Sequence, residues 1–198
     1  MGCFDGLPYA NRIWENARFR ALMRRIGELE RDRIYCRHGI THALDVCRIA
    51  WILYLEHYAG ADAAFADPGE RDAAHQTLPA APLLSVKDHI YCIGLLHDTG
   101  RETQYDTGEN HAQAGARIAG EILLQIGYPA DAARDAQRII GAHCGRLPAE
   151  TFQTMLPDAD GIKCCIHMAD QLSRNCSFCP VSDTCKWSED EKITAIHV

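Results

Sequence analysis

Apolar residues recur along most of the chain at the spacing of three and four residues that marks one face of an α-helix. In residues 41–58, for example, Val46, Ile49, Ala50 and Leu53 form such a stripe. No run of alternating apolar and polar residues is long enough to predict a β-strand. The sequence therefore predicts an all-α protein, with helices over residues 11–31, 41–58, 86–98, 110–126, 131–143 and roughly 158–174.

Glycine and proline residues separate these expected helices. Breaks fall at Gly100, at Gly127-Tyr128-Pro129 and at Leu147-Pro148. Residues 59–84 are rich in Ala, Gly and Pro, and we interpret them as a long insertion or loop. We expect one helical domain over residues 1–174, with residues 175–198 forming a cysteine-rich extension packed on the same domain.

Composition and charge narrow the class of protein. The 198 residues, 47% of them hydrophobic, are enough to enclose one sizeable core. The formal net charge of −7 disfavours a nucleic-acid partner, because such partners require a basic surface. No stretch approaches the roughly 18 consecutive apolar residues of a membrane-spanning helix, and the first residues lack an apolar signal segment. We expect a cytoplasmic protein without nucleic-acid or membrane partners, and the sequence indicates no oligomeric state.

Imidazole and carboxylate side chains lie at the ends of several expected helices. The segment "GLLHDTGR" places His97 and Asp98 side by side where an apolar helix ends. Four further residues of these types lie near other helix ends: His42, His111, His143 and Asp170. Five helices can therefore present imidazole or carboxylate groups to one interior site. For His111 and His143, a purely structural role is the alternative.

The order of a His, a His-Asp pair and a distant Asp resembles the HD-domain superfamily of metal-dependent phosphohydrolases. The residues that carry this resemblance are His42, His97, Asp98 and Asp170, and it extends over roughly residues 34–174. The resemblance implies an HD-domain-like helical bundle with these residues as the metal core. His111 and His143 resemble the additional ligands of subgroups that hold two metals. The Gly-Tyr-Pro signature of the phosphodiesterase subgroup is not at its expected position, since Gly127–Pro129 lies before His143.

This resemblance implies a hydrolytic centre. Mixed imidazole and carboxylate ligands suit Fe, Mn, Co, Ni or Zn, and we expect two ions bridged by Asp98. A metal-bound hydroxide would attack a phosphoester or phosphoanhydride of a small, nucleotide-like substrate. Arginines one turn beyond the expected ligands are candidates for binding the substrate phosphate: Arg101, Arg146 and Arg174. Arg101 is the strongest of these and, with Asp98, the expected catalytic pair, whereas an exposed helix end is the alternative for each arginine.

Clustered cysteines near the C-terminus indicate a second site. The spacing of Cys176, Cys179 and Cys185 resembles the C-terminal loop of endonuclease III-type DNA glycosylases and of nucleases that bind a [4Fe–4S] cluster. Structural zinc uses the same two-residue spacing, and free or oxidised thiols are the third interpretation. Cys36 is the expected fourth ligand, because it precedes His42 by six residues as Cys176 follows Asp170 by six. Other candidates for the fourth ligand are Cys164, Cys165 and His197.

Three further cysteines lie apart from this cluster. Cys47, Cys92 and Cys144 lie singly in apolar sequence and are predicted to be small buried hydrophobic residues.

HD-type di-iron oxygenases use a similar ligand set, so oxygen activation is an alternative to hydrolysis. A non-catalytic sensor of iron or redox state, using the cysteine cluster, is the other alternative.

Overall fold

The computed structural model describes residues 6–59, 84–144 and 159–196, and their regular elements are all helical. The predicted all-α fold class is confirmed. The α-helices are α1 (Pro8–Glu15), α2 (Ala17–Leu29), α3 (Ile40–Tyr54), α4 (Val86–Leu96), α5 (Arg101–Thr107), α6 (His111–Gln125), α7 (Ala130–Gly141) and α9 (Ala159–Leu172). A π-helical turn, η1 (Leu55–Ala59), continues α3. Most of the expected insertion at 59–84, and Arg146, lie outside the described residues.

The segment predicted as one helix over residues 11–31 forms two helices that meet at Asn16. The backbone of Asn16 is extended, with φ −64° and ψ 124°. Its side-chain oxygen accepts hydrogen bonds of 3.0 Å from the backbone N–H groups of Arg18 and Phe19. Asn16 therefore caps the N-terminus of α2 and separates it from α1, a change of direction that the apolar periodicity does not reveal.

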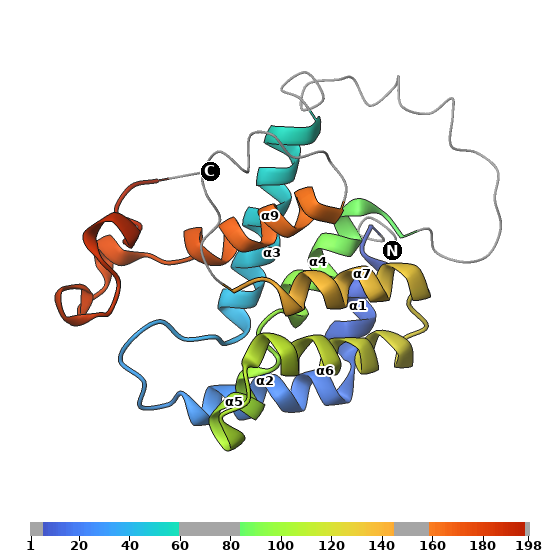
Figure 1. Cartoon of the computed structure of the whole chain (residues 1–198), viewed down its shortest axis with the longest axis horizontal. Helices are drawn as coiled ribbons and strands as arrows, with labels where there is room; N and C mark the ends of the chain where they lie inside the picture. The colour runs from blue at the N-terminus through green and yellow to red at the C-terminus, as the bar shows by residue number, and fades with distance from the viewer. Residues whose placement is uncertain (1–5, 60–83, 145–158, 197–198) are drawn as a thin grey trace, which may run out of the picture.

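The core lies where α3 packs against α4 and α9, and α6 packs against α7 (Figure 1). Fully buried side chains from these helices fill the interior: Val46, Ile90, Ile93, Leu96, Ile122, Leu123, Ile139, Ile140 and Ile166. Close approach of α3 and α4 depends on Gly94, where an added Cβ would lie 2.6 Å from the Cys47 sulfur. This packing brings the first turn of α3, the end of α4, the start of α6 and the last turn of α9 toward one region.

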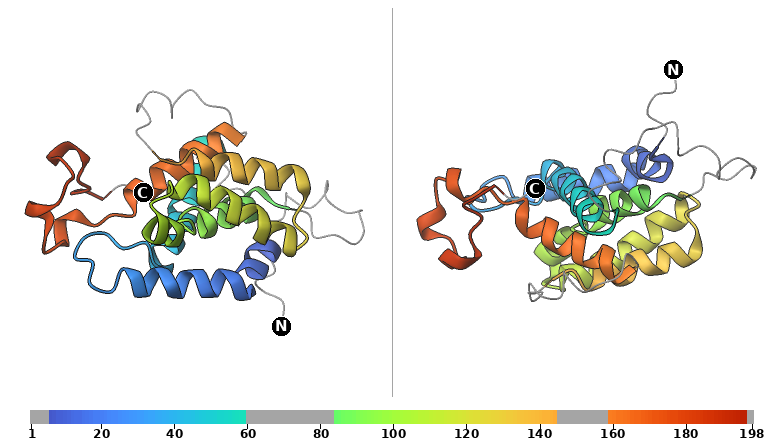
Figure 2. Two further views of the ribbon diagram at one scale, coloured as in Figure 1. Left: turned by 60° about the horizontal axis from the view of Figure 1, so that its bottom comes forward. Right: turned by 90° about the horizontal axis from the view of Figure 1, so that it is seen from above.

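After α9 the chain forms three short 3-10 turns, η4 (Cys176–Phe178), η5 (Ser182–Thr184) and η6 (Glu189–Glu191). This segment lies at one end of the molecule, beside the connection between α2 and α3 (Figures 1 and 2). The Tyr35 hydroxyl donates a 3.1 Å hydrogen bond to the Thr184 carbonyl, and the Cys176 N–H donates one of 3.1 Å to the Ile193 carbonyl. These contacts join residues far apart in sequence.

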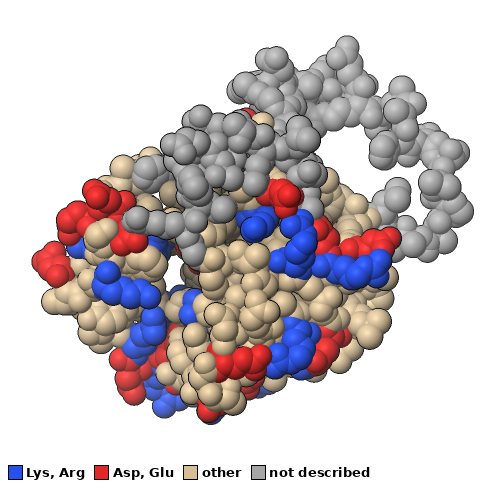
Figure 3. Space-filling model, viewed as in Figure 1, with Lys and Arg blue, Asp and Glu red and all other residues tan. Residues whose placement is uncertain are grey.

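The surface of the described residues mixes charges of both signs. In the view of Figure 3, basic and acidic side chains lie next to one another, and neither sign forms a continuous band across this face. Many of them pair locally, as Arg117 does with Glu109 at 3.1 Å. No helix among the described residues is both long enough and apolar enough to cross a bilayer.

Candidate metal centre

The structure brings all six predicted metal ligands to one place, each from a helix end. His42 lies in the first turn of α3 and Asp170 in the last turn of α9, while His97 and Asp98 directly follow α4. His111 is the first residue of α6, and His143 follows the end of α7. Their side chains form two groups of ligand atoms that share Asp98 as a neighbour.

The first group contains His42, His97, Asp98 and Asp170, whose ligand atoms all lie within 4.8 Å of one another. His42 Nε2 lies 3.2 Å from His97 Nε2, 3.2 Å from Asp170 Oδ1 and 3.4 Å from Asp98 Oδ2. His97 Nε2 lies 3.3 Å from Asp98 Oδ2. Two nitrogens and two carboxylate oxygens thus converge on one point, which is a ligand set for a divalent transition metal.

Hydrogen bonds at Nδ1 determine which nitrogen of each histidine is free. His97 Nδ1 lies 2.7 Å from the Gly94 carbonyl, and His143 Nδ1 lies 2.6 Å from the Ile140 carbonyl. A carbonyl oxygen only accepts, so each Nδ1 carries the proton and donates it. In the neutral ring the lone pair then lies on Nε2 and is directed into the centre, as in metal-binding histidines.

His42 reaches the same tautomer through Ser173. The Ser173 hydroxyl donates to the Asp170 carbonyl at 2.7 Å. Its oxygen is then an acceptor for His42 Nδ1, which lies 3.1 Å away. The last turn of α9 therefore supplies both Asp170 and the group that orients His42.

The carboxylate of Asp98 is buried and only partly hydrogen-bonded within the described residues. It is 3% exposed, and its Oδ1 accepts a 2.9 Å hydrogen bond from Arg101 Nε. Its Oδ2 is buried and has no hydrogen-bond partner among the described residues. Burial raises the pKa of Asp98, but the neighbouring imidazoles, His97 foremost, more than offset this and hold the pKa well below its usual range. A buried, ionised carboxylate with a free oxygen is suited to binding a metal ion.

The carboxylates of Asp98 and Asp170 stabilise the protonated form of His42. Burial lowers the pKa of this histidine, but Asp170 and Asp98 more than offset the effect and raise it to about 9. A proton and a metal ion compete for the same Nε2 lone pair, so metal binding at this group releases a proton wherever His42 is charged. The donor set therefore fits a divalent cation.

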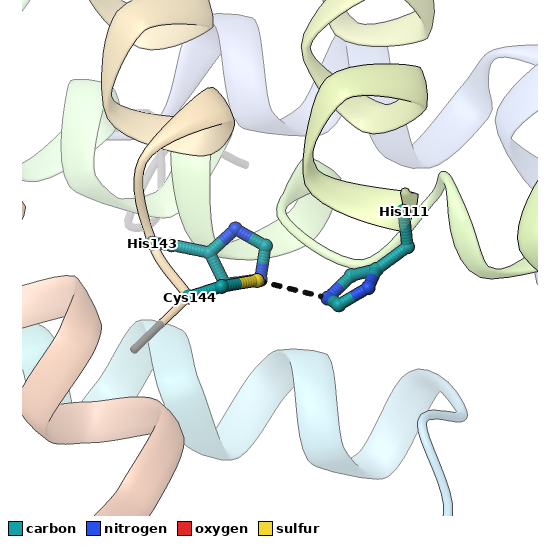
Figure 4. A group of neighbouring side chains, drawn as sticks. All are labelled: His111, His143 and Cys144. Atoms are coloured by element: carbon teal, nitrogen blue, oxygen red, sulfur yellow. Dashed lines mark hydrogen bonds between the residues drawn. The ribbon is translucent and has the colours of Figure 1, made fainter. Parts of the chain in front are cut away.

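The second group contains His111, His143 and Cys144 (Figure 4). Cys144 Sγ lies 3.2 Å from His111 Nε2 and 3.7 Å from His143 Nε2. Asp98 Oδ1 lies 3.6 Å from His111 Nε2 and 3.8 Å from His143 Nε2. Asp98 thus directs one carboxylate oxygen toward each group, the arrangement that a bridging ligand requires.

The prediction that Cys144 is a buried hydrophobic residue is wrong. Cys144 is exposed, and its sulfur contacts two imidazoles instead of a core. Helix α7 ends at Gly141, two residues before the predicted end at residue 143, so Cys144 lies beyond the packed helix. Its position directly after His143 was the available signal, since consecutive residues at a helix end can both reach one centre.

The predicted phosphate-binding arginines differ in where they lie. Arg101 contacts the centre, with Nε on Asp98 and Nη1 donating to Gln104 Oε1 at 3.1 Å. Arg174 instead packs over the Trp187 ring, 4.2 Å from its centroid, and donates from Nε to the Gln171 carbonyl at 2.9 Å. The structure thus gives Arg174 partners in α9 and the C-terminal segment. For Arg174 and Arg146, substrate binding stays a prediction.

His167 supports the centre without belonging to either ligand group. Its Nδ1 donates to the His143 carbonyl at 2.6 Å, and Gln171 Nε2 donates to its Nε2 at 2.8 Å. His167 is 3% exposed and lies one turn before Asp170 on α9. It therefore links the helix that carries Asp170 to the backbone of His143 and helps to hold both in position.

The four predicted cysteine ligands lie in neighbouring segments. Cys36 is exposed and Cys176 is buried, while Cys179 and Cys185 are half-buried. Burial raises the pKa of the Cys36 thiol, and the nearby Arg174 guanidinium offsets part of this effect. Within residues 6–59, 84–144 and 159–196, ligand atoms gather within 4.8 Å only at the two histidine groups. The cysteines do not form so close a set.

The fold and the centre together define a helical protein in which histidines and aspartates at helix ends form groups that could hold a metal ion. Residues 39–175 match the sequence model of the HD domain, and the chain belongs to this family. The chain is also 27% identical over 182 residues to an uncharacterized protein of Clostridium beijerinckii, covering 92% of this chain and 94% of that protein. It is similar to the crystal structure of a predicted HD superfamily hydrolase from an uncultured Thermotogales bacterium. That similarity has a TM-score of 0.48 and 20% sequence identity, with coverage of 87% of this chain and 79% of the other.

Proposed function

We propose that the protein is a metal-dependent phosphohydrolase that cleaves a phosphoester or phosphoanhydride of a small, nucleotide-like substrate. The observation that carries the proposal is the position of Asp98. Its two carboxylate oxygens face two separate groups of imidazoles, and one oxygen is buried without a donor. Membership of the HD-domain family supports a metal-dependent hydrolase.

Two ions are proposed, with Asp98 contributing to both. His42, His97, Asp98 and Asp170 would hold the first, and His111 and His143 with Asp98 would hold the second. When bound, such ions polarise a phosphoryl oxygen and lower the pKa of water, so that hydrolysis proceeds near neutral pH. Iron, manganese, cobalt, nickel and zinc all suit this donor set.

The position of Arg101 supports the proposal that the substrate is phosphorylated. Its Nε holds Asp98 Oδ1 and its Nη1 holds Gln104, while Nη2 has no hydrogen-bond partner among the described residues. The guanidinium can therefore orient Asp98 and still donate to a phosphate oxygen beside the two ions. One side chain would couple the bridging carboxylate to the substrate.

The decisive experiment is a hydrolysis assay on protein purified without oxygen. Mononucleotides, dinucleoside polyphosphates and phosphomonoesters are incubated with Mn, Co, Ni, Fe or Zn, and the products are separated by chromatography. We expect hydrolysis by the wild type and a loss of at least about 10³-fold in Asp98→Asn. The matched control Asp131→Asn changes a 93% exposed aspartate outside the centre and keeps full activity.

Two outcomes would contradict the phosphohydrolase. Metal-loaded wild type that cleaves no member of the panel would remove its support. Oxygen consumption that requires an organic substrate and Asp98 would assign the centre to the di-iron oxygenases instead.

We also propose that Cys36, Cys176, Cys179 and Cys185 hold a structural [4Fe–4S] cluster. The Tyr35 hydroxyl donates a hydrogen bond to the Thr184 carbonyl, so the segment that carries Cys36 lies against the segment that carries the other three cysteines. This contact supports one site built from both segments, and four thiolates are the ligand set of an iron–sulfur cluster. Iron and acid-labile sulfide in excess of the histidine centre are expected, and one tightly bound zinc per chain with no sulfide would exclude the cluster.

A further inference from the structure

We infer that Cys144 is a thiolate ligand of the second ion, so that the two halves of the centre differ in chemistry. The inference rests on the proposed two-ion centre and assigns a residue to it. The first half offers only nitrogen and oxygen donors, from His42, His97, Asp98 and Asp170. The second half adds sulfur, from Cys144, to the nitrogens of His111 and His143.

The geometry of the sulfur carries the inference. In Figure 4, His143 and Cys144 lie on the segment that follows α7, and the Cys144 sulfur points toward the His111 ring at the start of α6. Sγ lies 3.2 Å from His111 Nε2 and 3.7 Å from His143 Nε2. Because His143 Nδ1 donates to a backbone carbonyl, the lone pair of the neutral ring lies on Nε2, on the same side as the sulfur. Donors at these separations can contact a single ion.

The surrounding structure holds this arrangement in place. Gln113 Nε2 donates to the Gly141 carbonyl at 3.1 Å, which joins the first turn of α6 to the last residue of α7. His167 holds the His143 carbonyl from α9. The backbone at Gly141 and at His143, directly before Cys144, is therefore joined to α6 and to α9.

Asp98 supplies an independent observation. This aspartate is only 3% exposed. Its Oδ1 lies 3.6 Å from His111 Nε2 and 3.8 Å from His143 Nε2. With Cys144, the second ion would have two nitrogens, one sulfur and one oxygen as donors. A tetrahedral metal site uses four donors, and nitrogen, sulfur and oxygen are the donor types that such sites use.

A thiolate changes which ions the second half accepts. Thiolates favour zinc, iron and cobalt, whereas magnesium and calcium favour oxygen donors. Binding requires loss of the thiol proton, and the thiolate and Asp98 together balance the charge of a divalent ion. We therefore expect zinc or cobalt, but not magnesium, to engage Cys144.

Site-resolved alkylation tests this assignment on the full chain. Metal-free protein is treated with iodoacetamide with no metal, with Zn²⁺ or with Mg²⁺, and the modification of each cysteine is measured by peptide mass spectrometry. We expect Zn²⁺ to slow alkylation of Cys144 by tenfold or more and Mg²⁺ to leave it unchanged. His111→Ala should lose this protection, while the matched variant His57→Ala, which changes an exposed histidine outside the centre, should keep it.

A second readout uses zinc affinity. Cys144→Ser should weaken zinc binding to the second half by tenfold or more in a chelator competition, while the first half keeps its affinity. Equal alkylation of Cys144 with and without Zn²⁺, in protein that elemental analysis shows to hold zinc, would overturn the assignment. So would a protein that binds no zinc at all.

These outcomes separate the assignment from the proposed hydrolase. Protection of Cys144 in a protein that hydrolyses nothing would support the thiolate ligand and reject the hydrolase. Hydrolysis with an unprotected Cys144 would support the hydrolase and reject the ligand.

Discussion

At the scale of single residues, the centre depends on which atom of each side chain its neighbours leave free. His97 and His143 donate from Nδ1 to backbone carbonyls, and His42 has the Ser173 hydroxyl at the same atom. All three therefore present Nε2. Asp98 shows the same principle with oxygen, since Arg101 holds Oδ1 while Oδ2 lacks a donor. The groups that hydrogen-bond to the ligand side chains therefore determine the geometry of the centre as much as the ligands themselves do.

Ser173 provides a test of this principle. In Ser173→Ala, His42 loses the acceptor for its Nδ1 proton, and we expect metal affinity at the first group to fall about 10–100-fold. Competition with a fluorescent chelator measures the change. Ser177→Ala is the matched control, because the Ser177 hydroxyl donates at 3.0 Å to the Thr194 carbonyl in the C-terminal segment. Equal affinity in the two variants would mean that Ser173 does not orient His42.

At the scale of helices, the centre requires close backbone contact between the α4–α5 turn and α6. Gly100 lies in this turn, two residues after Asp98. A Cβ added there would lie 2.0 Å from the His111 carbonyl oxygen and 2.4 Å from the Gly115 nitrogen, both of them backbone atoms. No rotamer change can relieve such contacts. The absence of a side chain at Gly100 therefore allows His111 to approach Asp98.

Gly100→Ala should consequently destabilise the protein by about 2–4 kcal/mol and weaken binding of the second ion, because α6 must move. Gly27→Ala is the matched control. Gly27 lies within α2, where a Cβ meets no atom within 4 Å, so alanine there should raise the free energy of unfolding by about 0.5–1 kcal/mol. Urea denaturation measures both variants. A Gly100→Ala protein as stable as the wild type would contradict the close contact.

At the scale of the whole molecule, a buried carboxylate connects three segments. Glu30, 2% exposed at the end of α2, accepts from the His38 N–H at 2.7 Å, from the His38 ring at 2.5 Å and from the Tyr105 hydroxyl of α5. Burial raises the pKa of Glu30, but the hydrogen bonds from His38 and Tyr105 more than offset this and lower it to about 2. The chain between α2 and α3, which carries Cys36 toward the C-terminal segment, is anchored here.

The lowered pKa predicts how stability depends on pH. The stabilisation by the Glu30 carboxylate is complete above its ordinary value of 4.5 and is lost as the pH falls toward about 2. Glu30→Gln should therefore be less stable than the wild type by about 1–3 kcal/mol at pH 7. The difference should shrink between pH 4.5 and 2. Denaturation at several pH values measures it, with the exposed Glu28→Gln as the control, and a difference independent of pH would exclude the carboxylate as its source.

Periodicity and residue type predicted much of this protein from its sequence. The apolar stripes located most of the helices, and the order of His42, His97, Asp98 and Asp170 along the chain indicated the family that the HD-domain match confirms. The break at Asn16 and the short helix α5 were not predicted. Both depend on local polar contacts and glycines, to which an apolar periodicity is insensitive.

What only the tertiary structure decided is how the helix ends meet. A hydrophobic stripe states which face of a helix is buried, but the crossing of one helix on another sets the distances between their ends. The sequence by itself therefore determined most of the helices and which residue types are candidate ligands, and it could not place Cys144 beside His111 or Arg174 over Trp187. Those placements follow from the packing of α6 on α7 and from the path of the chain after α9, and they involve residues 33 and 13 positions apart along the chain.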